Sequence, residues 1–207
     1  LAIDLGLLAL FAVQHSVMAR RGFKRWLTKL VPQPAERSTY VLASSLALIA
    51  LFYFWQPIGG VVWDVSDPML RLALYVLRAC GWLLVLIATF LINHFDLFGL
   101  RQVWRYAAAK PYSPLPFGTP VLYRVVRHPL YLGWLFAFWA TPTMTVAHLV
   151  FALATTAYIL LAIQLEERDL MHAHPEYREY RARVPMIIPL LKRRDPRTKP
   201  AERLASS

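Results

Sequence analysis

The sequence predicts an all-α, polytopic integral membrane protein with about five transmembrane helices, a C-terminal helical hairpin and a cytoplasmic tail helix. Hydrophobic residues make up 57% of the 207 residues and charged residues only 17%, whereas soluble domains average about 25% charged residues. The mean hydropathy of +0.41 is higher than a water-soluble domain of this size needs. The lone cysteine, Cys80, argues against a disulfide-stapled secreted domain.

Three apolar stretches in the first half of the chain each predict one spanning helix. They are residues 1–18, 40–55 and 70–92, and each has close to the roughly 20 residues that cross a bilayer. A signal peptide carries its basic residues before the apolar stretch. Here Arg20, Arg21, Lys24 and Arg25 follow the first stretch, so we interpret that stretch as a spanning helix.

The fourth apolar stretch, residues 130–165, carries no charge. It is too long for one span and short for two. Thr141-Pro142-Thr143 near its middle predicts a turn between two antiparallel arms. Each arm would have about 16 residues and a length of roughly 24 Å. The sequence therefore predicts a helical hairpin here.

The net charge of +11 is concentrated in alternate loops. Segments 19–38 and 94–129 and the tail after residue 165 are rich in Lys and Arg, whereas segment 56–69 has neither and carries Asp64 and Asp67. Because positive loops stay in the cytoplasm, we expect a bacterial inner-membrane protein with its N-terminus outside and its C-terminus inside. The charge then indicates topology and contact with anionic membrane lipid, and we expect no nucleic-acid partner.

Most of the acidic and histidine residues lie at the predicted cytoplasmic ends of the spans. They form the groups Gln14-His15, Asn93-His94-Phe95-Asp96, Arg127-His128-Pro129 and Glu166-Glu167-Arg168-Asp169. Ionisable residues at membrane segments indicate function by default, and groups on one side of the membrane are able to converge. We expect no metal, because His172 and His174 are two residues apart and do not share a helix face, and no zinc-binding motif is present.

The stretch from residue 127 to residue 185 carries an ordered set of motifs. It reads Arg127-His128-Pro129-Leu130-Tyr131-Leu132-Gly133, then the apolar hairpin, then Glu166-Glu167, and it closes with Tyr177-Arg178-Glu179-Tyr180 and Val184-Pro185. This set resembles the isoprenylcysteine carboxyl methyltransferase superfamily over about residues 120–189. The resemblance implies an integral membrane enzyme that uses S-adenosylmethionine and releases S-adenosylhomocysteine.

A closer resemblance covers nearly the whole chain. Gln14-His15-Ser16-Val17-Met18 and Glu36-Arg37-Ser38-Thr39-Tyr40 are similar to the nurim-like branch of the superfamily. Residues 93–103 and 138–144 are similar to the bacterial members of that branch that methylate methanethiol to dimethyl sulfide. The resemblance implies one methyltransferase domain over residues 1–191, with a cofactor-binding part at about 94–189. A basic flexible tail would occupy residues 192–207.

The implied reaction needs a thiolate, because the thiolate and not the thiol is the nucleophile. His94 and His15 are candidate proton acceptors, since imidazole titrates near neutral pH. Asp96 is a candidate to orient His94 or to take the proton itself, and the resemblance adds Arg101 to these candidate catalytic residues. Positioning alone contributes several kcal/mol in a two-substrate reaction, so a mechanism without a dedicated base stays open. The structural alternatives are helix caps for His94 and Asp96, and helix packing for Gln14 and His15.

Nine residues of the motif set are candidate cofactor-binding residues. One of Glu166 and Glu167 would accept hydrogen bonds from the ribose hydroxyls while the other pairs with an arginine, and the sequence leaves that choice open. Tyrosine faces would stack on adenine and attract the sulfonium, and Gly133 lets a backbone or a ligand approach closely. The nine are Arg127, His128, Pro129, Tyr131, Gly133, Glu166, Glu167, Tyr177 and Tyr180. On this basis Glu167→Ala weakens cofactor binding, whereas His94→Ala or Asp96→Ala lowers turnover alone.

Two rival functions stay open at this point. One is methylation of a larger lipophilic acceptor, such as a prenylcysteine-like carboxylate. The other is a non-catalytic, nurim-like membrane protein. The sequence leaves the oligomeric state undetermined.

Overall fold

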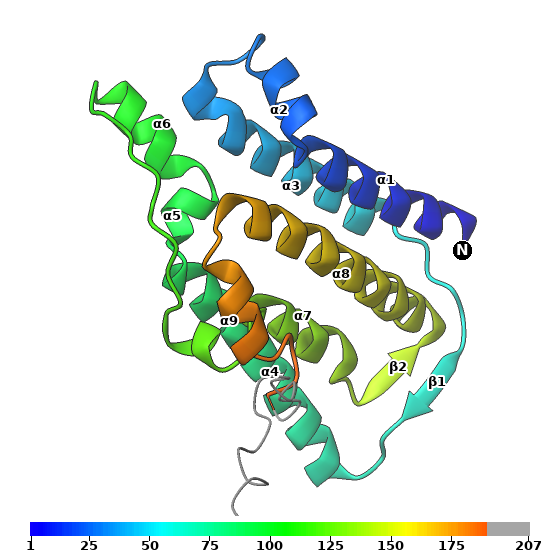
Figure 1. The fold of residues 1–207 in the computed structure, drawn as a ribbon. Helices are drawn as coiled ribbons and strands as arrows, with labels where there is room; N and C mark the ends of the chain where they lie inside the picture. Colours follow the sequence, from blue (N-terminus) through cyan, green and yellow to red (C-terminus); the bar gives the residue numbers. More distant parts are fainter. Residues whose placement is uncertain (190–207) are drawn as a thin grey trace, which may run out of the picture.

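The computed structural model describes residues 1–189 and is mostly helical. The expected tail at 192–207 lies outside the described residues. The elements, in chain order in Figure 1, are α1 (Ala2–Met18), α2 (Arg21–Leu27), η1 (Gln33–Ala35), α3 (Glu36–Phe54), β1 (Val61–Asp64), α4 (Pro68–Leu91), α5 (His94–Leu97), α6 (Leu100–Ala107), η2 (Val121–Arg124), α7 (Pro129–Trp139), β2 (Thr143–Thr145), α8 (Val146–Ala173) and α9 (Tyr177–Arg183).

Within residues 1–189, three helices are long and apolar enough to cross a membrane. They are Gln33–Phe54, Pro68–Leu91 and Val146–Ala173, and α1 with α2 makes a fourth if that pair, bent by 79°, is one broken span. The described residues therefore support a membrane protein with three to four candidate spans, and the predicted number of five is not confirmed. The difference lies in α7, which has 11 residues and is too short to span by itself.

The C-terminal hairpin has unequal arms rather than two arms of about 16 residues. Its turn lies where Thr141-Pro142-Thr143 predicts it, but α7 has 11 residues and α8 has 28. Pro129 at the first turn of α7 fixes its start. The turn interrupts the helix after Trp139, and α8 then continues through Glu166 and Glu167 to Ala173. Charged residues therefore do not end this helix, although the apolar stretch ends at residue 165.

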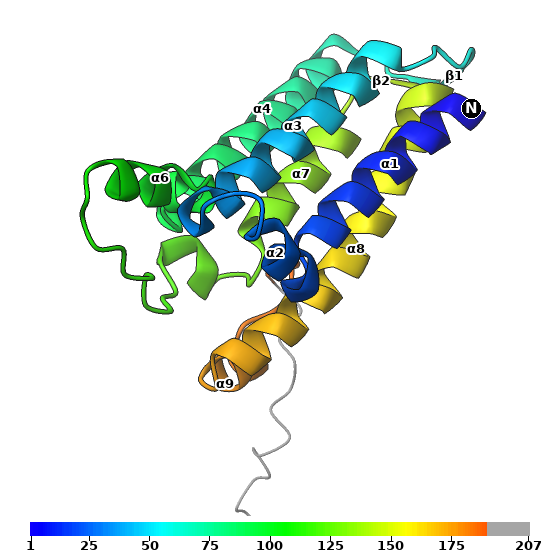
Figure 2. The ribbon, with the colours of Figure 1, turned by 90° about the horizontal axis from the view of Figure 1, so that it is seen from above.

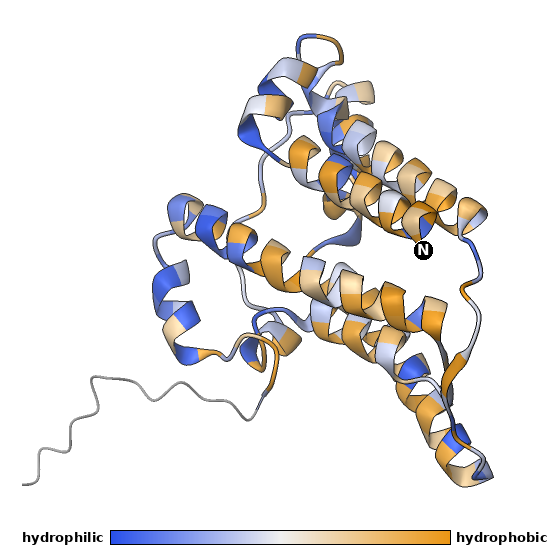
Figure 3. Cartoon of the chain, turned by 90° about the vertical axis from the view of Figure 1, so that its right-hand side faces the viewer, coloured by the Kyte–Doolittle hydropathy of each residue, from blue (hydrophilic) through white to orange (hydrophobic). Residues whose placement is uncertain are grey.

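Large hydrophobic side chains cover the outward surfaces of the long helices. Many of them are more than half exposed in the isolated chain, including Leu46, Phe52, Leu83, Leu86, Phe90, Leu153 and Leu161. Figure 3 shows this apolar covering along the helices, with hydrophilic segments gathered mainly toward one end. A soluble monomer rarely exposes apolar patches of this extent. The surface fits a protein whose helices face lipid.

Helices α4 and α7 pack closely because glycine occupies both sides of their contact. A Cβ atom built on Gly133 would lie 2.8 Å from the carbonyl oxygen of Gly81, and one built on Gly81 would lie 2.7 Å from the amide nitrogen of Ala137. Small residues allow membrane helices to approach at their backbones. The sequence predicts that Gly133 allows close approach of either a backbone or a ligand. In the structure Gly133 allows the backbone of α4 to approach.

Replacing Gly133 with alanine is expected to destabilise the protein by about 1–3 kcal/mol, because the added methyl group overpacks the α4–α7 contact. The melting temperature of the purified protein in detergent measures this effect. Gly6→Ala in α1 is the matched control, since a Cβ atom there meets nothing within 4 Å. If the two variants melt at the same temperature, the close contact between α4 and α7 at Gly133 does not stabilise the protein.

A small antiparallel sheet closes one end of the bundle and was not expected from the sequence. Strand β1 pairs with β2 with Trp63 opposite Met144 and Asp64 opposite Thr143. Asp64 accepts hydrogen bonds from Thr143 Oγ1 at 2.6 Å and from Arg71 at 3.0 Å, and these bonds lower the pKa of its carboxyl group. The sheet joins the α3–α4 connection to the α7–α8 turn, as Figures 1 and 2 show.

Candidate active site

A cavity of about 880 Å³ lies at the end of the bundle opposite the sheet. The start of α7 and the ends of α4 and α8 contribute to its wall, together with α9, the 115–120 loop, η2 and the start of α3. Polar groups from distant parts of the sequence therefore meet here. Six of the nine candidate cofactor-binding residues line this cavity, namely Arg127, His128, Tyr131, Glu166, Tyr177 and Tyr180.

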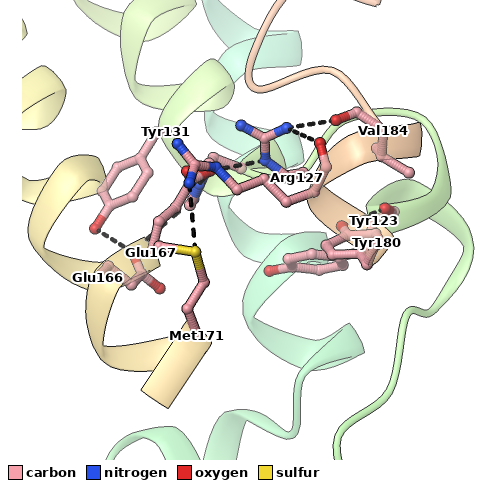
Figure 4. A network of polar contacts seen from close by, with 10 residues as sticks. Tyr123, Arg127, Tyr131, Glu166, Glu167, Met171, Tyr180 and Val184 are labelled. Carbon is pink, nitrogen blue, oxygen red and sulfur yellow. Dashed lines mark hydrogen bonds and ion pairs between the residues drawn. The ribbon is translucent and has the colours of Figure 1, made fainter. Parts of the chain in front are cut away.

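Glu167 lies behind the cavity wall, at the centre of a buried ionic network (Figure 4). Its side chain is only 2% exposed. Oε1 accepts a hydrogen bond from Arg127 Nε at 2.7 Å and lies 3.1 Å from His128 Nε2. Oε2 forms an ion pair with Arg181 Nε at 2.8 Å. A buried carboxylate must be paired in this way to offset its loss of hydration, so Glu167 holds α7, α8 and α9 together.

Arg127 fastens the segment after α9 to the start of α7. Its Nη1 donates to the carbonyl oxygens of Arg181 at 2.9 Å and Val184 at 2.6 Å. The backbone amides of Arg127 and His128 donate to the carbonyl oxygens of Pro185 and Met186. This network explains why the Arg-His-Pro and Val-Pro motifs occur in one chain, because each supplies one side of the same contact.

Glu166, the neighbour of Glu167, faces the cavity instead. Its side chain is 46% exposed, and Oε2 accepts a hydrogen bond from Tyr131 Oη at 3.1 Å. One carboxylate oxygen is therefore held in place by α7 while the group stays accessible from the cavity. The structure thus separates the two adjacent glutamates by position: Glu166 lines the cavity and Glu167 lies in the protein interior.

Aromatic side chains form one wall of the cavity. Phe117 of the loop lies 5.9 Å, between ring centroids, from both Tyr177 and Tyr180 of α9. Burial raises the pKa of Tyr180 to about 12 and also raises the pKa of Tyr177, so both hydroxyls stay protonated. Tyr180 Oη donates to the carbonyl oxygen of Tyr123 at 2.5 Å. Tyr177 Oη is buried and has no hydrogen-bond partner among residues 1–189.

Pro129 and Gly133 determine how α7 begins and how it packs, and they are not part of the cavity wall. Pro129 is fully buried at the first turn of α7, and Gly133 contacts α4. Neither of them lines the cavity.

His94, Asp96 and Arg101 lie beside the cavity rather than in its wall. His94 Nδ1 is 3.0 Å from Thr89 Oγ1, and its ring stacks on Phe90 at 4.5 Å. Asp96 accepts a hydrogen bond from Arg101 at 2.9 Å and one from Tyr112 at 3.2 Å. Their catalytic roles stay predictions, and in this structure these side chains stabilise α5, α6 and the loop that follows.

His15 does not line the cavity and lies where α1 contacts α3. Its ring nitrogens contact Tyr40 and Ser44 of α3. The sequence predicts His15 near the end of a helix, and the structure places it near the end of α1. The sequence does not indicate that Ser44 contacts His15, and it indicates Tyr40 only as part of the motif at residues 36–40.

Several residues of the cavity wall were not predicted. Asn93 lines the cavity and adopts a left-handed conformation with φ 74°, which ends α4 and starts α5. Arg37 lines it from the start of α3, with Nε donating to the carbonyl oxygen of Leu97 at 2.8 Å. The loop that carries Phe117 does have a recognisable sequence feature, namely Pro111, Pro114, Pro116 and Pro120. Repeated prolines indicate an extended chain, and Phe117 of this loop lines the cavity. Within residues 1–189 there is no cluster of three His, Cys, Asp or Glu side chains able to hold a metal ion.

Comparison with known proteins gives the family. The model of the family described as NnrU protein matches residues 5–187. The chain belongs to this family. It is 60% identical to a methanethiol S-methyltransferase of Crocosphaera subtropica, over 92% of this chain and 75% of that protein. It is 55% identical to the methanethiol S-methyltransferase of Mycobacterium tuberculosis, over 90% of this chain and 77% of that protein.

A more distant similarity links this NnrU-family chain to nurim of Sus scrofa, with 34% identity over 83% of this chain and 68% of that protein. This agrees with the nurim-like motifs in the first and third helices. No solved structure matches the chain.

Proposed function

We propose that this NnrU-family protein transfers a methyl group from S-adenosylmethionine to a small thiol, methanethiol, and forms dimethyl sulfide. The similarity to proteins named methanethiol S-methyltransferase, at 50–60% identity over most of the chain, supports this function. The observation that carries the proposal is that the methyltransferase-like motifs, which are far apart in the sequence, line one cavity.

The residues of the cavity fit the proposed cofactor. Its volume of about 880 Å³ is within the range of about 300–1,000 Å³ typical of ligand sites. The accessible carboxylate of Glu166 is an acceptor for ribose hydroxyls. The buried Tyr177 hydroxyl, which has no partner among residues 1–189, is a donor that a ligand would satisfy. The Phe117 and Tyr180 rings offer faces to adenine.

Each part of the site then has a physical task. When bound, the cofactor supplies a methyl group on a positively charged sulfur. Glu166 would hold the ribose, and the aromatic wall would exclude water and attract the cation. The Glu167 network keeps α7, α8 and α9 in register around the cavity, so that cofactor and acceptor meet in a fixed geometry. Positioning of this kind contributes several kcal/mol to a two-substrate reaction.

We place this site on the cytoplasmic side of a bacterial inner membrane, with the N-terminus outside. The cavity lies at the same end of the bundle as the basic segments around α2 and α6, and positive loops stay in the cytoplasm. Anionic lipid is then a partner of these basic segments.

Binding and turnover test the proposal directly. Purified protein in detergent is expected to bind S-adenosylhomocysteine with micromolar affinity by calorimetry. It is also expected to form labelled dimethyl sulfide from methanethiol and methyl-labelled S-adenosylmethionine. Folded protein that binds the cofactor product but makes no dimethyl sulfide would contradict the acceptor, and absence of binding would contradict the methyltransferase itself.

Acceptor competition separates this function from its enzymatic rival. A prenylcysteine-like carboxylate is ionised at neutral pH and needs no deprotonation. Turnover of methanethiol should rise with pH toward the range in which thiols ionise, whereas turnover of a carboxylate should not. Product formation from the prenylated acceptor alone would favour the rival. A protein that binds no cofactor product would agree with a non-catalytic nurim-like role.

A further inference from the structure

The contact of α1, α3 and α8 contains a polar cluster that the cofactor cavity does not use. Tyr40 Oη lies 2.7 Å from His15 Nε2 and 3.0 Å from Nδ1, and Ser44 Oγ lies 3.2 Å from Nδ1. Phe11 stacks on the His15 ring at 5.3 Å, and Tyr158 meets it edge-on at 6.3 Å. The imidazole is therefore held by hydroxyl groups inside an aromatic environment.

The contacts accommodate the neutral form of His15 that carries its proton on Nδ1. In this form Nδ1–H donates to Ser44 Oγ, which also accepts a hydrogen bond from Gln14 Nε2 at 3.4 Å. Nε2 then accepts the hydroxyl proton of Tyr40, whose oxygen lies closer to Nε2 than to Nδ1. No carboxylate or guanidinium group contacts the ring within residues 1–189. The result is a basic nitrogen directed at a hydroxyl group.

This cluster lies beside the cofactor cavity. Arg37, one turn before Tyr40 on α3, lines the cavity. Arg37 and Tyr40 are three residues apart, so their side chains share one face of α3. Tyr40 is thus the member of the cluster nearest to this part of the cavity wall, and it contacts His15 on its other side.

Few other titratable groups surround His15. Tyr40 faces it from α3 and Tyr158 faces it from α8. On α2, Lys24 is already paired with Glu36 at 3.6 Å. The charged groups that act on the two tyrosines are Arg37 and Glu166 for Tyr40, and Arg20 for Tyr158.

We propose that Tyr40 and His15 remove the proton from the thiol acceptor; this inference rests on the function proposed above. As the S–H bond breaks, the proton passes to Tyr40 Oη, and the Tyr40 proton passes to His15 Nε2. The acceptor sulfur forms a bond to the methyl carbon, and the bond from that carbon to the departing sulfur breaks, leaving its electron pair on S-adenosylhomocysteine. His15 then returns the proton to water. Tyr40 is the catalytic residue, and His15 acts through it.

The Tyr40–His15 proton relay is needed because a charged group is energetically unfavourable in a site that excludes water. An isolated thiolate in an apolar site has lost its hydration, so the proton must leave while the new S–C bond forms. General-base catalysis of this kind contributes about 10²–10⁴-fold to the rate. Imidazole is the side chain suited to taking a proton near neutral pH, whereas serine or asparagine would suffice for helix packing alone.

The experiment compares two acceptors in variants that keep the packing. Tyr40→Phe and His15→Gln are each expected to lower kcat for methanethiol at neutral pH about 100-fold, with the affinity for S-adenosylhomocysteine unchanged. With methaneselenol, whose proton is far more acidic than that of the thiol, both variants are expected to keep nearly the wild-type kcat. For the thiol, raising the pH is expected to restore part of the lost rate.

Ser16→Ala is the matched control, because it removes the 3.1 Å contact of Ser16 with Tyr158 between the same helices and leaves the proposed relay intact. It is expected to keep the wild-type rate with both acceptors. Equal losses with thiol and selenol in the Tyr40 and His15 variants, or unchanged rates with the thiol, would overturn the inference while the proposed function stands. If the wild-type protein methylates no thiol at all, the proposed function fails and this inference fails with it.

Discussion

Glu167→Ala is expected to be the most damaging single substitution in the described part of the chain, with a loss of about 3–5 kcal/mol in the free energy of unfolding. Removing one partner of a buried ion pair leaves the other charge uncompensated. Here the alanine would leave the guanidinium groups of Arg127 and Arg181 without their shared carboxylate. Because Arg127 also holds the segment after α9, we expect the cofactor site to be lost together with stability.

The melting temperature in detergent and limited proteolysis after residue 173 measure this effect. Glu179→Ala is the control, since Glu179 and Arg183 form an exposed ion pair at 3.6 Å on α9, and such pairs contribute only about 0–1 kcal/mol. The same change of residue type on a neighbouring helix should therefore leave the melting temperature almost unchanged. A Glu167→Ala protein that melts like the wild type would show that the network does not support the fold.

The structure assigns Glu167 a different role from the one that its motif predicts. From the motif alone, Glu167→Ala weakens cofactor binding directly, because adjacent carboxylates at a helix end are equivalent in a sequence. On a helix, neighbouring residues point about 100° apart, so only one of the two faces the cavity. Which one does so depends on the rotation of α8, which is set by contacts with Arg127, His128 and Arg181 from two other elements.

The long helices were predictable because their signal is local. Apolar stretches at 1–18, 40–55 and 70–92 correspond to α1, α3 and α4, since lipid-facing helices need continuous apolar sequence. Proline and threonine also mark the turn of the hairpin. The lengths of the hairpin arms were wrong, because hydropathy does not show that α8 continues past Leu165 with charged residues. The two short strands give no periodic signal of their own.

The candidate site was predictable only in its location. The motif residues Arg127, Tyr131, Glu166, Tyr177 and Tyr180 do converge on one cavity. His94 and Asp96 do not line it, because the left-handed turn at Asn93 directs α5 away from the cavity wall. The 115–120 loop carries none of the predicted residues, and its place in the wall depends on long-range contacts such as those of Phe117 with α9.

Glu166→Gln should have the second large effect, and that effect should fall on the ligand instead of the fold. Glu166 is 46% exposed and makes one described hydrogen bond, with Tyr131, so glutamine is accommodated with little loss of stability. A hydrogen bond to a charged group contributes about 1.5–3 kcal/mol. If the carboxylate accepts the ribose hydroxyls, its removal is expected to weaken S-adenosylhomocysteine binding about 10- to 100-fold.

A mutant cycle with a modified ligand identifies the contact. Wild-type protein should bind the 2′-deoxyribose form of S-adenosylhomocysteine more weakly than the natural form, and Glu166→Gln should bind both forms almost equally. Asp169→Asn is the control, because Asp169 lies on the same helix, is 63% exposed and pairs with Arg20 at 3.7 Å outside the cavity. If Glu166→Gln weakens both ligands by the same factor, the carboxylate acts on another part of the cofactor. If it weakens neither, Glu166 does not hold the cofactor, and the buried Tyr177 hydroxyl becomes the next polar group to test.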